Sequence, residues 1–234
     1  FTMPNYGLAL YHQSEYALGD WTFTVGLRGD WEHCGLKSHS FSNTGYSIMH
    51  ILPDGKSELF RHDDINIDDR SNLSKSFFQL LPKFSISYAI SSLGKSSVYA
   101  SVAKGYKAGG YNTQMFSDIL SEKLKWRMAG SQYDEADLMS YEPEYSWNYE
   151  LGGHLRFLSG ALMVDYTAYC IETKNRHLAR FAESGLGRVT VNAGRSRSIG
   201  AELSLHAALL DNRLRLTGSY GYTHAKLTRH NLGE

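Results

Sequence analysis

Hydrophobic and polar residues alternate along one stretch near the middle of the chain, residues 145–157. Its odd positions are Tyr, Trp, Tyr, Leu, Gly, Leu and Phe, whereas most of its even positions are polar. Because neighbouring side chains of a β-strand point to opposite faces of the sheet, this period of two predicts a strand with one apolar face. The alternation resumes from Leu162 to Cys170 after Ser159 and Gly160, so the stretch predicts a hairpin.

The length of these two predicted strands narrows the class of protein. Each runs for about a dozen residues, whereas strands of soluble domains usually have about five or six. A strand of this length, tilted by about 45°, spans the hydrocarbon core of a bilayer. Aromatic residues lie where the two girdles of an outer-membrane barrel would fall: Tyr145, Trp147 and Tyr149 at one end and Phe157 at the other. A long hairpin of a soluble β-sandwich is the alternative.

The same alternation predicts six further strands, at Leu8 to Tyr16, Trp21 to Arg28, Phe78 to Ile90, Ser97 to Tyr111, Thr190 to Ala207 and Leu214 to Tyr222. Short connections, at residues 18–20, 92–96, 159–160 and 211–212, alternate with long ones, at residues 35–74, 112–140 and 174–188. We expect the long connections to be polar and irregular. In outer-membrane barrels the short turns are periplasmic and the long loops extracellular.

These observations predict an all-β fold, an antiparallel segment of a transmembrane β-barrel with about eight up-and-down strands. Both ends of the chain, Phe1 and Glu234, then fall on the extracellular side. A complete barrel normally begins and ends in the periplasm, so we expect an open sheet in which the first and last strands do not pair. The outer face should meet lipid through Leu162, Val164, Tyr166, Leu203, Leu216 and Tyr220.

Composition and charge add little to this prediction. The 234 residues include 24 basic and 24 acidic ones, which gives no sign of a nucleic-acid partner. Cys34 and Cys170 fall on predicted strands that lie far apart, so we predict two free thiols. The chain opens at Phe1 without a leader, so either a signal peptide was removed or the sequence is a piece of a longer protein.

No motif predicts an enzyme or a bound cofactor. The string from Gly194 to Ser198 lacks the second glycine of a nucleophile elbow. Gly105, Gly109 and Gly110 are not followed by the Lys-Ser/Thr pair of a phosphate loop. An acidic cluster could hold Ca²⁺, but its spacing is not that of an EF-hand and a solvated loop fits it better; its members are Asp63, Asp64, Asp68 and Asp69. We therefore predict no catalytic residue, metal or cofactor.

Three segments together resemble the barrel of a known family: VYASVAKGYKAGGYN (Val98 to Asn112), PEYSWNYELG (Pro143 to Gly152) and VNAGRSRSIGAELSL (Val191 to Leu205). They are similar to barrel blocks of TonB-dependent outer-membrane receptors. LLPKFSISYAI (Leu80 to Ile90) and the first hairpin, which ends in GLRGDWE, resemble the preceding blocks. The resemblance covers nearly the whole chain except the three long connections, and it is greatest to siderophore receptors of the pesticin and yersiniabactin type.

This resemblance implies a 22-stranded barrel in the outer membrane of a Gram-negative bacterium, closed by an N-terminal plug domain. It implies uptake of a scarce ligand, most of all a ferric siderophore, with energy from the TonB–ExbB–ExbD complex acting through the plug. Residues 1–234 would then be part of a single barrel domain that meets outer-membrane lipid, with the plug and the remaining strands absent. The alternatives are a cobalamin, haem or glycan ligand, a small stand-alone outer-membrane barrel, and a soluble β-sandwich binding module.

Two sets of residues follow as candidates for binding. We expect the polar face to line the lumen and to contact the plug through Asn148, Glu150, His154, Asp165 and Glu202. An anionic ferric chelate suits cationic and aromatic contacts. On the extracellular side these are Lys107, Tyr111, Tyr145, Arg176, His177 and Arg180.

Overall fold

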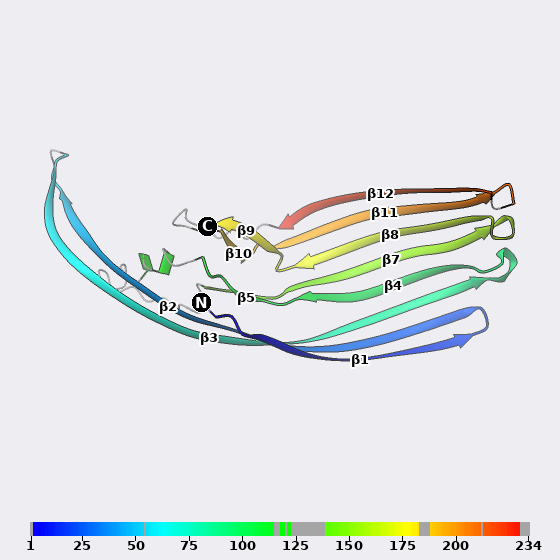
Figure 1. The fold of residues 1–234 in the computed structure, drawn as a ribbon, viewed down its shortest axis with the longest axis horizontal. Helices are drawn as coiled ribbons and strands as arrows, with labels where there is room; N and C mark the ends of the chain where they lie inside the picture. Colours follow the sequence, from blue (N-terminus) through cyan, green and yellow to red (C-terminus); the bar gives the residue numbers. More distant parts are fainter. Residues whose placement is uncertain are drawn as a thin grey trace.

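The computed structural model describes residues 2–53, 55–114, 118–119, 121–122, 139–182, 188–211 and 213–229. Within these ranges, the side chains of Arg229 and of several residues between positions 40 and 69 lie outside the description. Most of the described chain forms one curved antiparallel sheet of eight strands (Figure 1). No helix in these ranges is long and apolar enough to cross a membrane.

The strands follow one another in the sheet in the order β1-β2-β3-β4-β7-β8-β11-β12. Their bounds are β1 Asn5–Leu18, β2 Trp21–Ile51, β3 Ser57–Ile90, β4 Ser96–Lys107, β7 Glu144–Phe157, β8 Leu162–Lys174, β11 Arg195–Leu209 and β12 Leu214–Arg229. Every neighbouring pair is antiparallel. The prediction of eight up-and-down strands is therefore confirmed.

The four short connections lie together at one end of the sheet, as the alternation predicts (Figure 1). Two of them contain single turns of 3-10 helix, η1 at Ser91–Leu93 and η2 at Leu158–Gly160. Gly160 has a φ of 91°, a left-handed conformation that a side chain disfavours, so the glycine permits the tight reversal into β8. The long connections leave from the opposite end.

The first long connection is not irregular, and this prediction is wrong. β2 and β3 continue as a two-stranded arm that stays paired from Gly35↔Ser74 to Ile51↔Ser57. Backbone hydrogen bonds hold a ladder whichever side chains it carries, so two strands can stay paired where apolar and polar residues do not alternate. Loss of the alternation therefore did not mark the end of the strands. Asp54 and the side chains of Asp63 and Asp69 lie outside the described residues.

Two predicted strands are each divided by a break in the structure. β4 ends at Lys107, and β5 (Gly110–Tyr111) pairs instead with β6 (Ser140–Tyr141). β10 (Arg188–Asn192) pairs with β9 (His177–Phe181), and β11 begins only after Gly194. Gly194 has a φ of 77°, which turns the chain out of the β10 direction. The prediction of continuous strands at 97–111 and 190–207 is therefore wrong.

The sheet is open within the described residues. β1 and β12 are its two edges and do not pair with each other, as expected. Cys34 and Cys170 are both free, which confirms the prediction of two thiols.

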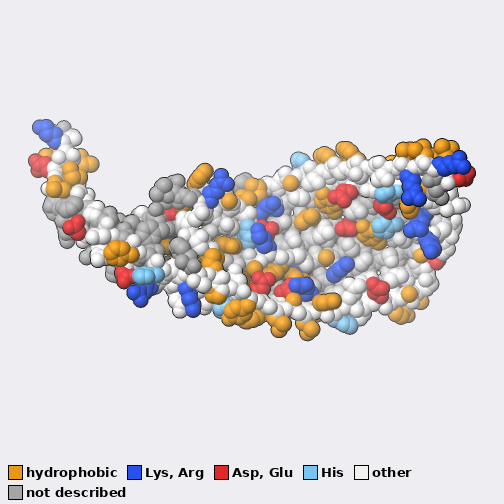
Figure 2. Space-filling view, in the orientation of Figure 1, with side chains coloured by type: hydrophobic (Ala, Val, Ile, Leu, Met, Phe, Trp, Pro, Cys, Tyr) orange, Lys and Arg blue, Asp and Glu red, His pale blue; other side chains and the backbone are white. Residues whose placement is uncertain are grey.

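The strand register separates apolar from polar side chains. One face carries the rows Tyr166–Leu203–Tyr220 and Leu162–Ala207–Leu216, with Val164 opposite Leu205 between them. The other face carries the row His154–Asp165–Ser204 and the pair Thr167–Glu202. Figure 2 shows charged and histidine side chains spread over the middle of the visible face, with hydrophobic side chains along its edges.

Tyrosine rings lie across glycines on neighbouring strands. A Cβ added at Gly152 would come within 2.7 Å of Cζ and Oη of Tyr99. Tyr169 lies over Gly200 in the same way, on the same face. Both rings are fixed at their tips, because the Tyr99 hydroxyl donates to Oε1 of Glu150 at 2.7 Å and the Tyr169 hydroxyl is 2.5 Å from Oγ1 of Thr223. Each glycine therefore makes room for a ring that spans adjacent strands.

Candidate ligand-binding site

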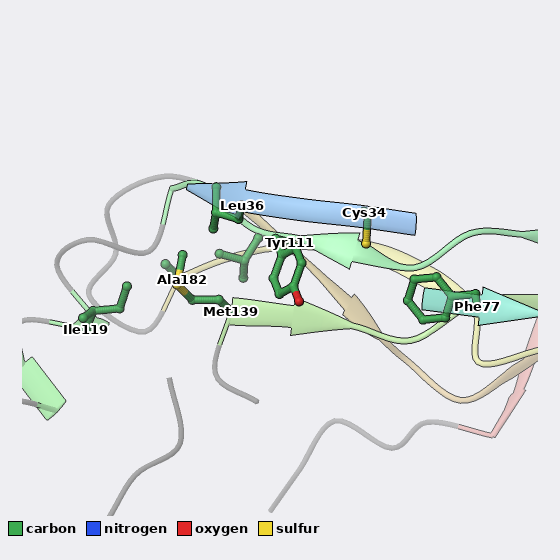
Figure 3. Packing of buried hydrophobic residues seen from close by; sticks show 8 residues of the cluster. Cys34, Leu36, Phe77, Tyr111, Ile119, Met139 and Ala182 are labelled. Carbon is green, nitrogen blue, oxygen red and sulfur yellow. The ribbon is translucent and has the colours of Figure 1, made fainter. Parts of the chain in front are cut away.

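A small hydrophobic core lies at the loop end of the sheet, where the arm begins (Figure 3). We call it the loop-end cluster; its members are Cys34, Leu36, Phe77, Tyr111, Ile119, Met139, Ala182 and Val189. Figure 3 shows Tyr111 in its middle, with Leu36 on one side and Met139 on the other. The cluster joins β2 and β3 to the two small sheets, β5–β6 and β9–β10. The long connections therefore pack against one another at the base of the arm.

Two asparagine side chains hold the small sheets together. Asn112 donates from Nδ2 to the carbonyl oxygen of Thr190 at 2.9 Å and accepts from the Thr190 N–H at 2.7 Å. Asn192 accepts from the Glu142 N–H at 2.7 Å and donates to the Glu142 carbonyl oxygen at 2.8 Å. Each amide thus satisfies both backbone groups of one residue, as a neighbouring strand would. These two contacts tie β10 to residues on either side of the second long connection.

Replacing Asn112 by Leu should loosen β10 from the rest of the loop end. The change leaves the N–H and carbonyl of Thr190 unpaired in a partly buried place, at a cost of about 1 to 3 kcal/mol. Hydrogen exchange of residues 188–192 in the intact receptor should then become about tenfold faster or more. Asn72→Leu, at an exposed position of the arm, is the control and should leave this exchange unchanged. Equal exchange in both variants would show that the Asn112 contacts do not hold β10.

Lys107 and His177, two predicted contact residues, are brought together through Glu144. Lys107 is exposed and lies opposite Glu144 in the register of β4 on β7. The backbone N–H of His177 donates to Oε2 of Glu144 at 2.7 Å. The His177 ring is held by its Nε2, 2.7 Å from the Glu142 carbonyl oxygen, and by an edge contact with the Tyr141 ring at 5.0 Å. The imidazole is therefore fixed in orientation.

The two predicted arginines have different environments. Arg176 is half-buried, and its Nη1 donates to Oγ of Ser196 at 3.2 Å. Its backbone also bonds to Ala193 and Gly194, so it closes the base of the third long connection. Arg180 is exposed on β9. Arg180 is therefore the more exposed of the two.

The two predicted tyrosines lie in separate places. Tyr111 is only 5% exposed, inside the loop-end cluster. Burial raises the pKa of Tyr111 and of Tyr141, because the charged phenolate loses its contact with water. Tyr145 lies at the start of β7, where its hydroxyl accepts from Nε2 of Gln79 at 3.1 Å and Nζ of Lys104 is 5.3 Å from the ring centroid. The six predicted residues therefore do not form a single pocket.

The structure adds one cation–aromatic pair that the sequence did not single out. The guanidinium of Arg188 is 5.7 Å from the ring of Phe181, and Phe181 is 67% exposed. The two residues face each other across the β9–β10 hairpin. Arg188 stood at the end of the predicted excursion, but its partner was unknown without that pairing. An exposed arginine on an aromatic ring is the type of contact expected for an anionic chelate.

The polar face carries a hydrogen-bond network that includes most of the second candidate set. Oε1 of Glu150 accepts from Tyr99, and its Oε2 is 3.3 Å from Nδ2 of Asn148. Nδ1 of His154 lies 2.7 Å from Oδ1 of Asp165. Glu202 shares this face and is exposed. Among the described side chains, no three His, Cys, Asp or Glu residues gather as a metal site.

Comparison with known proteins places these features in a family. Residues 1–233 match the family model described as TonB dependent receptor-like, beta-barrel. No curated protein is similar enough in sequence to count as a match.

Solved structures share the fold at low identity. The ferric yersiniabactin uptake receptor FyuA from Yersinia pestis has 18% identity and a TM-score of 0.57, over 96% of this chain and 28% of its own. The siderophore receptor PiuA from Acinetobacter baumannii has 15% identity and a TM-score of 0.62, over 97% and 26%. The hemophore receptor HasR from Serratia marcescens has 14% identity and a TM-score of 0.56, over 95% and 34%.

The chain thus spans between about a quarter and a third of each of these receptors. Its open eight-stranded sheet, with short turns at one end and packed long connections at the other, matches a section of their barrels. Proteins of this kind reside in the outer membrane of Gram-negative bacteria and are transporters, not enzymes. The chain therefore belongs to the TonB-dependent receptor family, as a part of its β-barrel.

Proposed function

We propose that this chain is part of the barrel of an active transport receptor that takes up a ferric siderophore from the extracellular side. The observation that carries the proposal is the family match over residues 1–233, together with the fold shared with FyuA and PiuA. Residues 1–234 belong to one barrel domain in this proposal, and the plug and the other strands lie outside them. Energy from the TonB–ExbB–ExbD complex reaches the ligand through the plug.

The chemistry of the loop end supports an anionic, ring-containing ligand. Lys107, Arg180 and Arg188 are exposed there, and Phe181 offers an open ring beside Arg188. Arginine matches carboxylate groups with two parallel hydrogen bonds, and aromatic rings stack on flat chelating groups. His177 and Arg176 keep the third long connection in place. Tyr145 lies opposite Lys174, on the apolar face of the sheet, where it contacts Lys104 and does not belong to this group. Tyr111 acts by packing, because its ring is buried.

The polar face lines the lumen in this proposal. Asn148, Glu150, His154, Asp165 and Glu202 then meet the plug domain, whose polar groups need partners once they leave water. The exposed members of this set support such contacts, because the side chains of His154 and Asp165 are 60% and 43% exposed and Glu202 is exposed as well.

Haem is the second candidate ligand. The fold likeness to the hemophore receptor HasR favours it over cobalamin or a glycan. Haem is also flat and carries carboxylates, so the same cations would suit it.

A binding panel with the purified full-length receptor tests the ligand class. We expect tryptophan fluorescence to report saturable binding of at least one ferric siderophore. Haem, cobalamin and a maltodextrin should give no comparable change. Binding of haem alone would replace the siderophore proposal, and binding of none of the four would contradict the transport proposal as stated.

Removing two exposed arginines should weaken siderophore binding. The double change Arg180→Ala and Arg188→Ala removes charged hydrogen-bond donors. A hydrogen bond from such a donor to the ligand contributes about 1.5 to 3 kcal/mol to the binding free energy. We therefore expect the Kd to rise at least about tenfold. Arg213→Ala, an exposed arginine in the last short turn, is the control and should bind as the unchanged receptor does. An unchanged Kd in the double variant would remove these arginines from the binding site.

A further inference from the structure

A group of cations lies on the apolar face of the sheet, close to its loop end. The register aligns Glu172, Arg197 and Lys226 in one row across β8, β11 and β12, with Trp147 of β7 beside Glu172. Arg195 lies opposite Lys174 in the strand register, one row closer to the loops. These side chains share the face of Val164, Leu203 and Tyr220, because they lie an even number of residues away along the same strands. They are therefore on the opposite face from Glu150 and His154.

The height of this group follows from the length of β11. From Ile199 to Leu209 every second residue on this face is Ile, Ala or Leu. Those ten steps span about 33 Å of strand, and about 23 Å across a membrane at a tilt of about 45°. This matches the apolar band of outer-membrane barrels, which is about 25 Å tall. Arg197 lies two residues beyond Ile199, the loop-side end of this band, and so is at the level of the lipid headgroups.

Four exposed cations in this group face a single carboxylate. The cations are Lys174, Arg195, Arg197 and Lys226, and Glu172 engages only one of them, through two donors of Arg197 to its Oε1. A groove of about 320 Å³ lies among them and is also lined by Thr228. The register of β11 on β12 shifts between Arg195 and Ser196, a bulge that re-aims the side chains around it. The charge of the group is thus mostly uncompensated within the described chain.

We propose that this group binds the phosphate groups of lipids in the outer leaflet of the surrounding membrane. The parallel N–H donors of an arginine side chain match two oxygens of a phosphate group. Basic clusters next to a membrane-spanning segment also attract anionic headgroups. Trp147 of β7 lies in the same row as Glu172 and Arg197, at the level where aromatic rings favour the membrane interface. The site is separate from the transport path, since it lies on the other face of the sheet.

The purified full-length receptor in neutral detergent tests this proposal by native mass spectrometry. Diphosphoryl lipid A is the probe, and an uncharged galactolipid with two acyl chains is the comparison. We expect the receptor to retain lipid A and not the galactolipid. The triple change Arg195→Ser, Arg197→Ser and Lys226→Ser should weaken lipid A binding at least about tenfold. Glu172→Gln, which removes the only carboxylate, should bind lipid A at least as tightly as the unchanged receptor.

Two controls separate this site from others. Arg213→Ser, at the short-turn end, should retain lipid A fully. The triple variant should keep the siderophore affinity of the unchanged receptor, which shows that it is folded. Full lipid A retention by the triple variant, or equal retention of the galactolipid by the unchanged receptor, would overturn the proposal. Displacement of lipid A by an equal concentration of inorganic phosphate would assign the site to free phosphate instead.

Discussion

Replacing Val164 by Arg in the intact receptor is expected to lower the free energy of unfolding by about 2 to 4 kcal/mol. Val164 lies opposite Leu205 on the apolar face, near the middle of the band that the β11 residues define. An arginine there would have to leave water for hydrocarbon, which is costly near the bilayer midplane. Urea unfolding of the receptor in lipid vesicles measures the change.

Ser204→Arg is the matched control, one residue along β11 from Leu205 and on the polar face opposite Asp165. An arginine there has a carboxylate and polar neighbours within reach, so the loss should be much smaller. Equal destabilisation by the two changes would mean that the two faces of the sheet are assigned wrongly.

Gly200→Ala is the second change with a large expected effect. A Cβ at this position would meet the ring of Tyr169 and would lie 2.6 Å from the carbonyl oxygen of Tyr222. Since the Tyr169 hydroxyl is also held by Thr223, the ring cannot move away without losing that contact. Overpacking of this kind costs about 1 to 3 kcal/mol. Unfolding of the intact receptor in urea should show a loss in this range.

Gly221→Ala tests the same exchange where there is room. Gly221 lies on the same face, on β12, and the nearest atom to its added Cβ is Cγ of Glu202 at 4.0 Å. This variant should be as stable as the unchanged receptor, or slightly more so. If Gly200→Ala is equally harmless, the tyrosine ring does not depend on the glycine beneath it.

The sequence predicted the wall of the barrel better than its loops. Alternate residues of a strand such as β8 lie on opposite faces of the sheet, apolar on one face and polar on the other, so Leu162 to Cys170 shows a period of two. The arm has no such alternation of apolar and polar residues, and the ladder from Gly35↔Ser74 onward was missed for that reason. The breaks at Lys107 and Gly194 depend on which segments pair, and periodicity carries no information about partners.

Candidate contact residues were harder still to predict. Tyr111 was predicted as a ligand contact because an aromatic ring suits an anionic chelate. Its ring is instead part of a buried cluster with Leu36 and Met139, which are far from it in sequence. Arg188 became a candidate contact only through its position on the ring of Phe181, across the β9–β10 hairpin. The roles of Asn112 and Asn192 rest on backbone groups of distant residues, which no local pattern shows.

Growth on defined iron sources tests the central claim most directly. Cells should be compared with and without the full-length gene, and with and without a working TonB system, on a panel of ferric siderophores as sole iron source. We expect loss of growth on at least one ferric siderophore in both deletions, and recovery when the gene is restored. A gene deletion that grows on every iron source but fails on cobalamin or a glycan would contradict the siderophore assignment. Growth on the siderophore without TonB would contradict active transport.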